Sequence, residues 1–285
     1  MYTRRDFGKI AFAAVPLMRT VGGVTIGVQT YSYRSLPVAG RDQSDSVLAA
    51  LKTDDAGEVE LFAPGIEPPP GPAFNRDALR QWRLSTPMDY FVALGKKFED
   101  AGVKIHSYTM NYNASFTDDE IDKTFQQGKG LGTNIIASST QVSMAKRLLA
   151  FAEKHKMLLA FHGHSNTKDA NEFATPESFQ QAIGLSKYAR INLDIGHFFA
   201  AGYDPVAFIQ EHHDHITHLH VKDRKKNDGP NMPWGEGDTP IKPVLLLLKD
   251  KKYPIPAFVE YEYRGTGTPA EEVKKCLDYM RQALA

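Results

Sequence analysis

The chain alternates short apolar runs with segments of helical periodicity, and this alternation limits the folds that are open to it. Eight apolar runs follow one another, at residues 24–31, 58–62, 104–110, 134–138, 157–162, 190–194, 216–222 and 257–262. The segments between them, such as residues 88–101, 142–155 and 271–284, carry apolar residues at the spacing of a helix with one buried face. Strands that alternate with helices in this way predict a parallel sheet covered by helices.

Eight strand–helix units favour a closed (β/α)8 barrel over an open, doubly wound sheet. The 285 residues fit one such barrel, because the fold uses about 250 residues. The dinucleotide-binding form of the open sheet has no support, since no Gly-x-Gly-x-x-Gly follows any of the runs. We therefore predict an α/β fold with a single barrel domain over residues 23–285, and the Pro- and Gly-rich residues 63–80 as a loop over its mouth.

Composition excludes several classes of partner. Lys plus Arg and Asp plus Glu both number 34, so the chain lacks the basic footprint of a nucleic-acid-binding protein. The apolar runs are too short to span a membrane in the mature protein. The single cysteine, Cys276, rules out an internal disulfide and a zinc site built from several thiolates.

The first residues are typical of an export signal. The pair Arg4-Arg5, followed by Phe7, Lys9 and a short apolar stretch, resembles a twin-arginine signal. We predict that residues 1–22 form this signal and that the protein is periplasmic. The alternative is an ordinary N-terminal helix on a cytoplasmic protein.

Titratable side chains stand at the ends of the last four predicted strands, where a barrel has its active site. They are His162 and His164, then Asp194, then His218 and His220, and finally Glu260 and Glu262. Side chains two apart on a strand share a face, so each pair offers alternatives for the interior position. Buried charge at such a rim is costly unless it is paired or bound to metal.

Two imidazoles and two carboxylates suit one class of metal ion. This ligand set favours Mn, Zn, Co or Fe over Mg and Ca, which prefer oxygen ligands alone. The sequence therefore predicts a divalent-metal site. A metal with open positions would polarise a bound carbonyl and acidify the neighbouring C–H.

Seven motifs occur in an order that resembles a known family. They are IGVQTYSYR at 26–34, VELF at 59–62, FHGH at 161–164, LDIGH at 193–197, HLHVKD at 218–223, WGEGD at 234–238 and VEYE at 259–262. The series is similar to the xylose isomerase-like TIM barrels, specifically the sugar phosphate isomerase/epimerase group, over about residues 24–284. The resemblance implies a metal bound by His162, Asp194, His220 and Glu260.

The chain departs from the family's epimerases at His162, where those enzymes carry a Glu. Their two carboxylates flank the substrate, one removing and one returning the carbon-bound proton. A metal-bound imidazole is a poor base, so Glu260, Glu262, His164 or Lys222 would share the proton transfer.

Further residues are assigned through the resemblance and their positions at strand ends. Candidates for catalysis are Glu260, His162, His197 and Lys222; candidates for substrate binding are Glu60, His106, His164, Arg224 and Glu262. Glu60 is alternatively a residue that orients a metal-binding His. Gln29 is a weaker candidate for the pocket, and Lys222 and Arg224 would bind a phosphate or polarise an oxygen.

The leading functional prediction is a metal-dependent isomerase or epimerase of a carbohydrate, acting by proton transfer next to a metal-chelated carbonyl. The alternative is a lyase or dehydratase on a keto-sugar or inosose-like substrate at the same site. Less favoured are a sugar-binding barrel without activity and a DNA-repair nuclease of the endonuclease IV type, which needs a basic face. Relatives often form dimers or tetramers, so a homo-oligomer is compatible with the resemblance.

Overall fold

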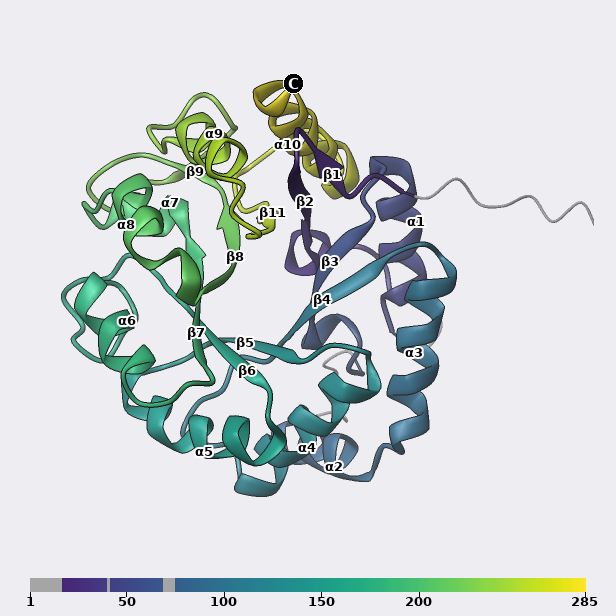
Figure 1. The fold of residues 1–285 in the computed structure, drawn as a ribbon. Helices are drawn as coiled ribbons and strands as arrows, with labels where there is room; N and C mark the ends of the chain where they lie inside the picture. The colour runs from purple at the N-terminus through teal and green to yellow at the C-terminus, as the bar shows by residue number, and fades with distance from the viewer. Residues whose placement is uncertain (1–16, 40–41, 69–74) are drawn as a thin grey trace, which may run out of the picture.

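The computed structural model describes residues 17–39, 42–68 and 75–285, and it contains a closed parallel barrel (Figure 1). The barrel strands are β2 (Val24–Gln29), β3 (Glu58–Phe62), β4 (Lys104–Thr109), β5 (Ile135–Ser139), β6 (Leu158–His162), β7 (Ala189–Asp194), β8 (Ile216–Val221) and β11 (Ala257–Val259). Each strand pairs with the next one in this order, and β11 closes the ring by pairing with β2. The predicted (β/α)8 fold is confirmed, because strands buried on both faces read as the continuous apolar runs seen in the sequence.

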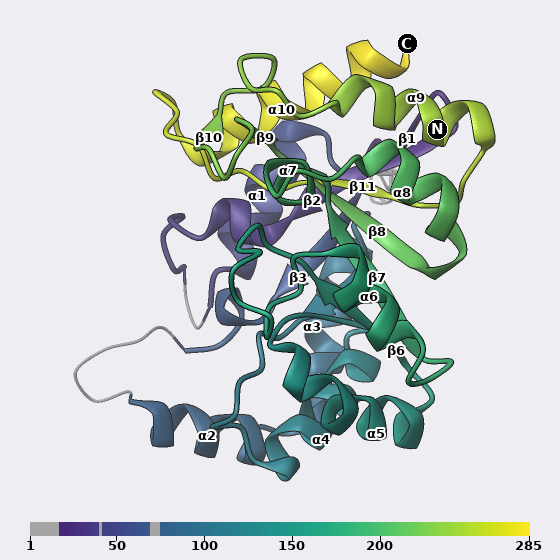
Figure 2. The same ribbon diagram turned by 90° about the vertical axis from the view of Figure 1, so that its left-hand side faces the viewer.

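Helices surround the barrel as an outer ring, which Figure 2 shows from the side. The α-helices are α1 (Ser44–Asp54), α2 (Arg76–Ser85), α3 (Met88–Asp100), α4 (Asp118–Gly130), α5 (Ala145–His155), α6 (Pro176–Ile183), α7 (Ile195–Ala200), α8 (Pro205–His212), α9 (Ile241–Lys251) and α10 (Pro269–Leu284). Short 3-10 turns are η1 (Thr30–Tyr33), η2 (Ala63–Gly65), η3 (Val142–Met144) and η4 (His213–His215). Within the described ranges, none of the helices has the length and apolar character needed to cross a membrane.

The barrel includes residues that the sequence analysis assigned to the export signal. Strand β1 (Thr20–Val21) pairs antiparallel with β2, and the amide of Gly57 donates to the carbonyl of Met18. Residues 17–22 therefore belong to the folded domain, since their backbone groups are paired with it. The rest of the predicted signal, residues 1–16, lies outside the described residues.

The predicted loop at residues 63–80 ends earlier than expected. Helix α2 begins at Arg76, and the side chain of Asn75 caps it by accepting bonds from the amides of Asp77 and Ala78. The Pro and Gly residues just before it obscured this short helix in the sequence. Residues 69–74 of the predicted loop lie outside the described part of the chain.

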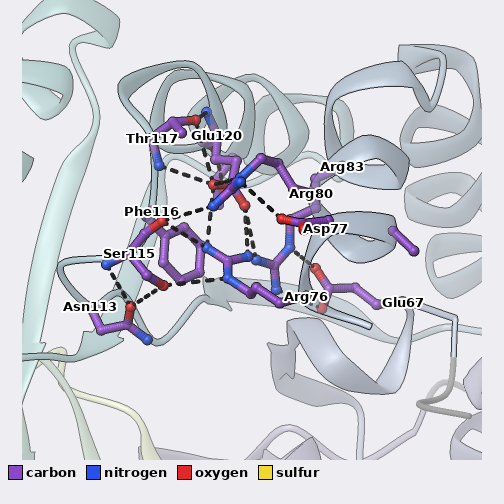
Figure 3. Close-up of polar contacts among 12 residues, drawn as sticks. Glu67, Arg76, Asp77, Arg80, Arg83, Asn113, Ser115, Phe116, Thr117 and Glu120 are labelled. Carbon is purple, nitrogen blue, oxygen red and sulfur yellow. Dashed lines mark hydrogen bonds and ion pairs between the residues drawn. The ribbon is translucent and has the colours of Figure 1, made fainter. Parts of the chain in front are cut away.

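A buried ion cluster ties α2 to the loop that follows β4 (Figure 3). The carboxylate of Glu120 is fully buried and pairs with Arg76 at 2.8 Å, Arg80 at 3.1 Å and Arg83 at 3.4 Å. Glu67 takes the remaining donors of Arg83 in a two-point contact of 2.6 and 2.9 Å. The cluster fixes the segment between β4 and α4, which borders the site described below.

We expect Glu120→Gln to lower the free energy of unfolding by about 2 kcal/mol, because it removes a fully buried carboxylate that accepts charged hydrogen bonds from three arginines. Thermal and urea unfolding measure the effect. The exposed partner of Arg80, Asp77, supplies a matched control: Asp77→Asn should cost less than about 0.5 kcal/mol. Equal losses in the two variants would contradict the structural role given to Glu120.

Candidate active site

A pocket of about 160 Å³ opens at the carboxyl ends of the barrel strands. Its walls are formed by Gln29, Tyr31, Glu60, Phe62, Thr109, Asn111, Ser139, His162, His164, His197, His220, Lys222, Glu260 and Glu262. Most of these side chains are polar, and they come from both halves of the barrel. The pocket can admit a small, hydroxyl-rich molecule.

Four of these pocket and rim residues form the cluster that the sequence predicts as a metal site. His162 and Asp194 are the last residues of β6 and β7, His220 lies on β8, and Glu260 follows β11. One potential ligand atom from each lies within 4.8 Å of the others, and all four residues are buried. Asp194 and His220 come together because they are directly paired across β7 and β8. The assignment of these four as ligands stays a prediction.

The charges of this cluster suit a cation. His162 Nδ1 is buried and makes no hydrogen bond within the described part of the chain, and the buried carboxylate of Asp194 lies 3.0 Å from the ammonium of Lys222. Burial raises the pKa of Asp194 to about 7, because Lys222 compensates its charge only in part. Burial and the nearby His220 hold the pKa of His162 well below its usual range, so this imidazole is neutral. A buried carboxylate whose charge is only partly compensated and an imidazole nitrogen without a partner are groups that a divalent ion would satisfy.

Glu60 contacts His220 of the predicted metal site, on the side of the ring away from Glu260. Its carboxylate lies 2.8 Å from Nε2 of His220, whose Nδ1 lies 3.0 Å from Glu260. Burial alone would raise the pKa of Glu60, but His220 and His218 outweigh burial and hold it well below its usual range. An ionised Glu60 keeps the proton of His220 on Nε2 and presents Nδ1 to the cluster, as carboxylate–histidine–metal triads do. The alternative role given to Glu60 in the sequence analysis matches this geometry.

Lys222 is buried among three carboxylates. Its ammonium lies 3.0 Å from Asp194, 2.8 Å from Glu260 and 2.6 Å from Glu262. Burial would lower the pKa of Lys222, but the carboxylates of Asp194 and Glu260 raise it above its usual value. The side chain is therefore a fixed positive charge in the pocket wall, and it cannot serve as a base.

His197 is held between two cations. Nδ1 accepts a 2.6 Å bond from Arg224, and Nε2 lies 3.1 Å from Lys222. Burial and Lys222 hold its pKa well below the usual range, so the ring is neutral and carries a single proton. Gly196 allows Lys222 to pack against the start of α7, since a Cβ at this position would clash with the side chain of Lys222.

Two residues predicted to bind substrate do not line the pocket. His106 points to the lower barrel interior, where Nδ1 lies 3.1 Å from Glu58 and its ring packs on His218 and Phe258. Arg224 lies behind His197 and donates to the carbonyl of Gly229. It contacts the pocket residue His197 at 2.6 Å and does not itself line the pocket.

The other predicted residues line the pocket. His164 is turned out of the four-residue cluster, with Nδ1 2.7 Å from Glu172 and Nε2 3.2 Å from Ser139. Glu262 pairs with Lys222, and Gln29 donates to Glu60 at 2.7 Å. The sequence analysis missed Asn111 and Ser139, which are uncharged. Their positions at the ends of β4 and β5 were the available signal.

Metal affinity should rise with pH. Glu60 and Glu260 raise the pKa of His220 well above its usual value, against the effect of burial. A cation must therefore displace a proton from His220 and, below pH 7, a second one from Asp194. We expect the logarithm of the zinc association constant to rise with pH, and more steeply below about pH 7, where Asp194 also carries a proton. Competition with a chromophoric chelator measures the zinc affinity at each pH. An affinity that does not change with pH would contradict the ligand assignment.

A parallel barrel with a polar, titratable pocket at the carboxyl ends of its strands is the arrangement of a barrel enzyme. The profile of the xylose isomerase-like TIM barrel family matches residues 140–283. The chain belongs to this family.

Three individual proteins resemble the chain. A stretch of 119 residues, 40% of this chain, is 29% identical to the L-ribulose-5-phosphate 3-epimerase UlaE of Salmonella paratyphi C and spans 42% of its length. The match thus covers less than half of that relative. The structure of an L-ribulose 3-epimerase has a TM-score of 0.67 and 14% identity, with 92% of this chain and 94% of the other covered. A zinc-bound IOLI protein has a TM-score of 0.64 and 13% identity, with 91% and 97% covered. These two structures share the fold.

Proposed function

We propose that the protein is a metal-dependent isomerase or epimerase of a sugar or sugar-derived substrate. The observation that carries this proposal is the convergence of His162, Asp194, His220 and Glu260 in one buried cluster at the mouth of the barrel. The L-ribulose-5-phosphate 3-epimerase that matches part of the chain supports the same class of reaction.

The four residues of the cluster would hold one divalent cation, through two nitrogens and two oxygens. This set favours zinc, manganese, cobalt or iron. When bound, such an ion polarises a carbonyl and acidifies the neighbouring C–H bond.

The pocket residues supply the proton transfer and the stabilisation of charge that the reaction needs. Burial would raise the pKa of Glu260, but Lys222 and His220 hold it well below its usual range, so Glu260 is ionised and accepts the carbon-bound proton. The ammonium of Lys222 lies in the pocket wall and stabilises negative charge that develops on a substrate oxygen. His162, in the position where the family's epimerases carry a Glu, supplies no second carboxylate. Proton transfer by one base, as in aldose–ketose isomerisation, therefore fits the site better than two-base epimerisation.

Solvent exchange tests the proposal. Zinc- and manganese-loaded protein is incubated in D₂O with a panel of ketoses, aldoses, their phosphates and disaccharides, and products are followed by NMR and mass spectrometry. We expect an isomer of the substrate whose mass differs from that of the substrate only by one deuterium. Removal of the metal with a chelator should abolish the exchange. A product that has lost water would assign the chain to the dehydratases instead. Absence of exchange with every sugar and both metals would overturn the proposal.

A further inference from the structure

A second cleft, of about 440 Å³, adjoins the pocket. Asn111, Ser139 and His164 line both spaces, so the two adjoin at this point. Beyond His164 the cleft is bounded by the loops after β4 and β6, through Asn113, Asn171 and Glu172 among others. The cleft therefore lies where a second unit of a ligand in the pocket would be placed.

Three asparagines present hydrogen-bond donors to this cleft. The side-chain oxygen of Asn111 accepts the amide of Ser139 at 3.1 Å, that of Asn113 accepts Ser115 at 2.9 Å, and that of Asn171 accepts Ser143 at 2.9 Å. Figure 3 shows the contact between Asn113 and Ser115. Each backbone bond fixes which end of the amide is oxygen, so the NH₂ groups are oriented by the protein. None of the three NH₂ groups has a partner in the described part of the chain.

Acceptors complete the lining. Glu172 holds His164 through Oε1, and Asp169 accepts the amide of Asn171 at 2.8 Å, so each carboxylate keeps a second oxygen for a ligand. Alternating NH₂ donors and carboxylate acceptors suit hydroxyl groups, because each hydroxyl both donates and accepts.

The same lining disfavours an anionic ligand. Among the described residues, neither Lys nor Arg lines the cleft, while two carboxylates do. Lys222 in the pocket is already neutralised by three carboxylates, and the Arg224 guanidinium is bonded to Gly229, Ser165 and His197. A phosphate on the substrate would find no uncompensated cation in either space.

From this lining we infer that the cleft binds a second, uncharged sugar unit. The substrate is then a disaccharide or another glycoside, whose reacting unit occupies the pocket and whose neighbouring unit lies past His164. The inference rests on the proposed function for the identity of the pocket ligand, and it narrows the substrate class from sugars in general to neutral glycosides.

Equilibrium binding tests the inference separately from catalysis. Zinc-loaded protein is titrated with cellobiose, maltose, D-glucose and D-glucose 6-phosphate, with saturation-transfer NMR reporting which ring contacts the protein. We expect at least one disaccharide to bind ten-fold or more tightly than D-glucose, with signals from both rings, and D-glucose 6-phosphate to bind more weakly than D-glucose. Equal affinity for D-glucose and both disaccharides, or tightest binding of the phosphate, would overturn the inference.

Isosteric variants place the second ring. Asn113→Asp and Asn171→Asp keep the oxygen that accepts the backbone amide and replace only the NH₂ group. Each should weaken disaccharide binding about ten-fold and leave D-glucose binding within two-fold. Asn166→Asp is the matched control, since Asn166 also accepts a backbone amide, that of Lys168, but does not line the cleft. Unchanged disaccharide affinity in both cleft variants would contradict the site.

The two proposals fail in different ways. Disaccharide binding that depends on Asn113 and Asn171 without any solvent exchange would support the cleft and refute the isomerase. The opposite result is a monosaccharide whose exchange rate is changed neither by a second ring nor by the cleft variants. It would support the isomerase and refute the cleft as a sugar-binding site.

Discussion

Replacing Glu260 by Gln is expected to slow deuterium exchange into the substrate by about 10³-fold, because the variant removes the base that accepts the carbon-bound proton. It also removes a charged ligand of the predicted cation site, so zinc affinity should fall as well. The amide keeps the size of the carboxylate, and circular dichroism and thermal unfolding check that the barrel is intact.

Glu262→Gln is the matched control for this experiment. Glu262 lines the same pocket and also pairs with Lys222, at 2.6 Å, but it lies outside the four-residue cluster. Glu262→Gln should leave zinc bound and lower the exchange rate by less than about 10-fold. The variant removes one carboxylate contact of Lys222, and the other two carboxylate contacts of Lys222 remain. An exchange rate that depends on Glu262 more than on Glu260 would reverse the assignment of the base between the two carboxylates.

The barrel was predictable because its signal is local. Strands of a closed parallel barrel are buried on both sides, so each one appears in the sequence as a short apolar run. The convergence of His162, Asp194, His220 and Glu260 was also open to prediction, since the strand-end rule brings the last side chains of neighbouring strands to one rim.

Depth along the barrel axis and pairing over long distances were not predictable. Alternation places His162 and His164 on one face, but it does not say which reaches the cluster; the structure turns His164 to Glu172. His106 faces the interior as expected, yet it lies below the pocket at the level of Glu58. The position of a side chain along the barrel axis depends on the stagger between strands, and no local sequence pattern indicates this stagger.

The position of Arg224 depends on short elements with no sequence signal. Strand β9 (Asp223–Arg224) pairs with β10 (Asn231–Met232), and this hairpin directs Arg224 behind His197. Strands of two residues are too short to show periodicity. The sequence analysis therefore assigned Arg224 to substrate binding because of its charge and its place near a strand end. In the structure, Arg224 bonds to the neighbouring side chain of His197.

Lys222→Met should separate catalysis from metal binding. Lys222 is 2% exposed and contacts two predicted metal ligands, Asp194 and Glu260. Removing its charge should slow exchange by about 10²-fold, because the pocket loses a fixed cation that stabilises charge on the substrate oxygen. Zinc affinity should rise, since the ammonium no longer competes for the two carboxylates.

The stability of this variant should depend on metal in a way that wild type does not. Without metal, three carboxylates lose their shared partner, and the free energy of unfolding should fall by about 3 kcal/mol. Saturating zinc should recover most of this loss, because a divalent ion replaces the missing positive charge. Lys222→Arg is the control that keeps the charge. If Lys222→Met loses zinc as Glu260→Gln does, Lys222 supports the geometry of the cluster, and its role as the fixed cation for the substrate oxygen is refuted.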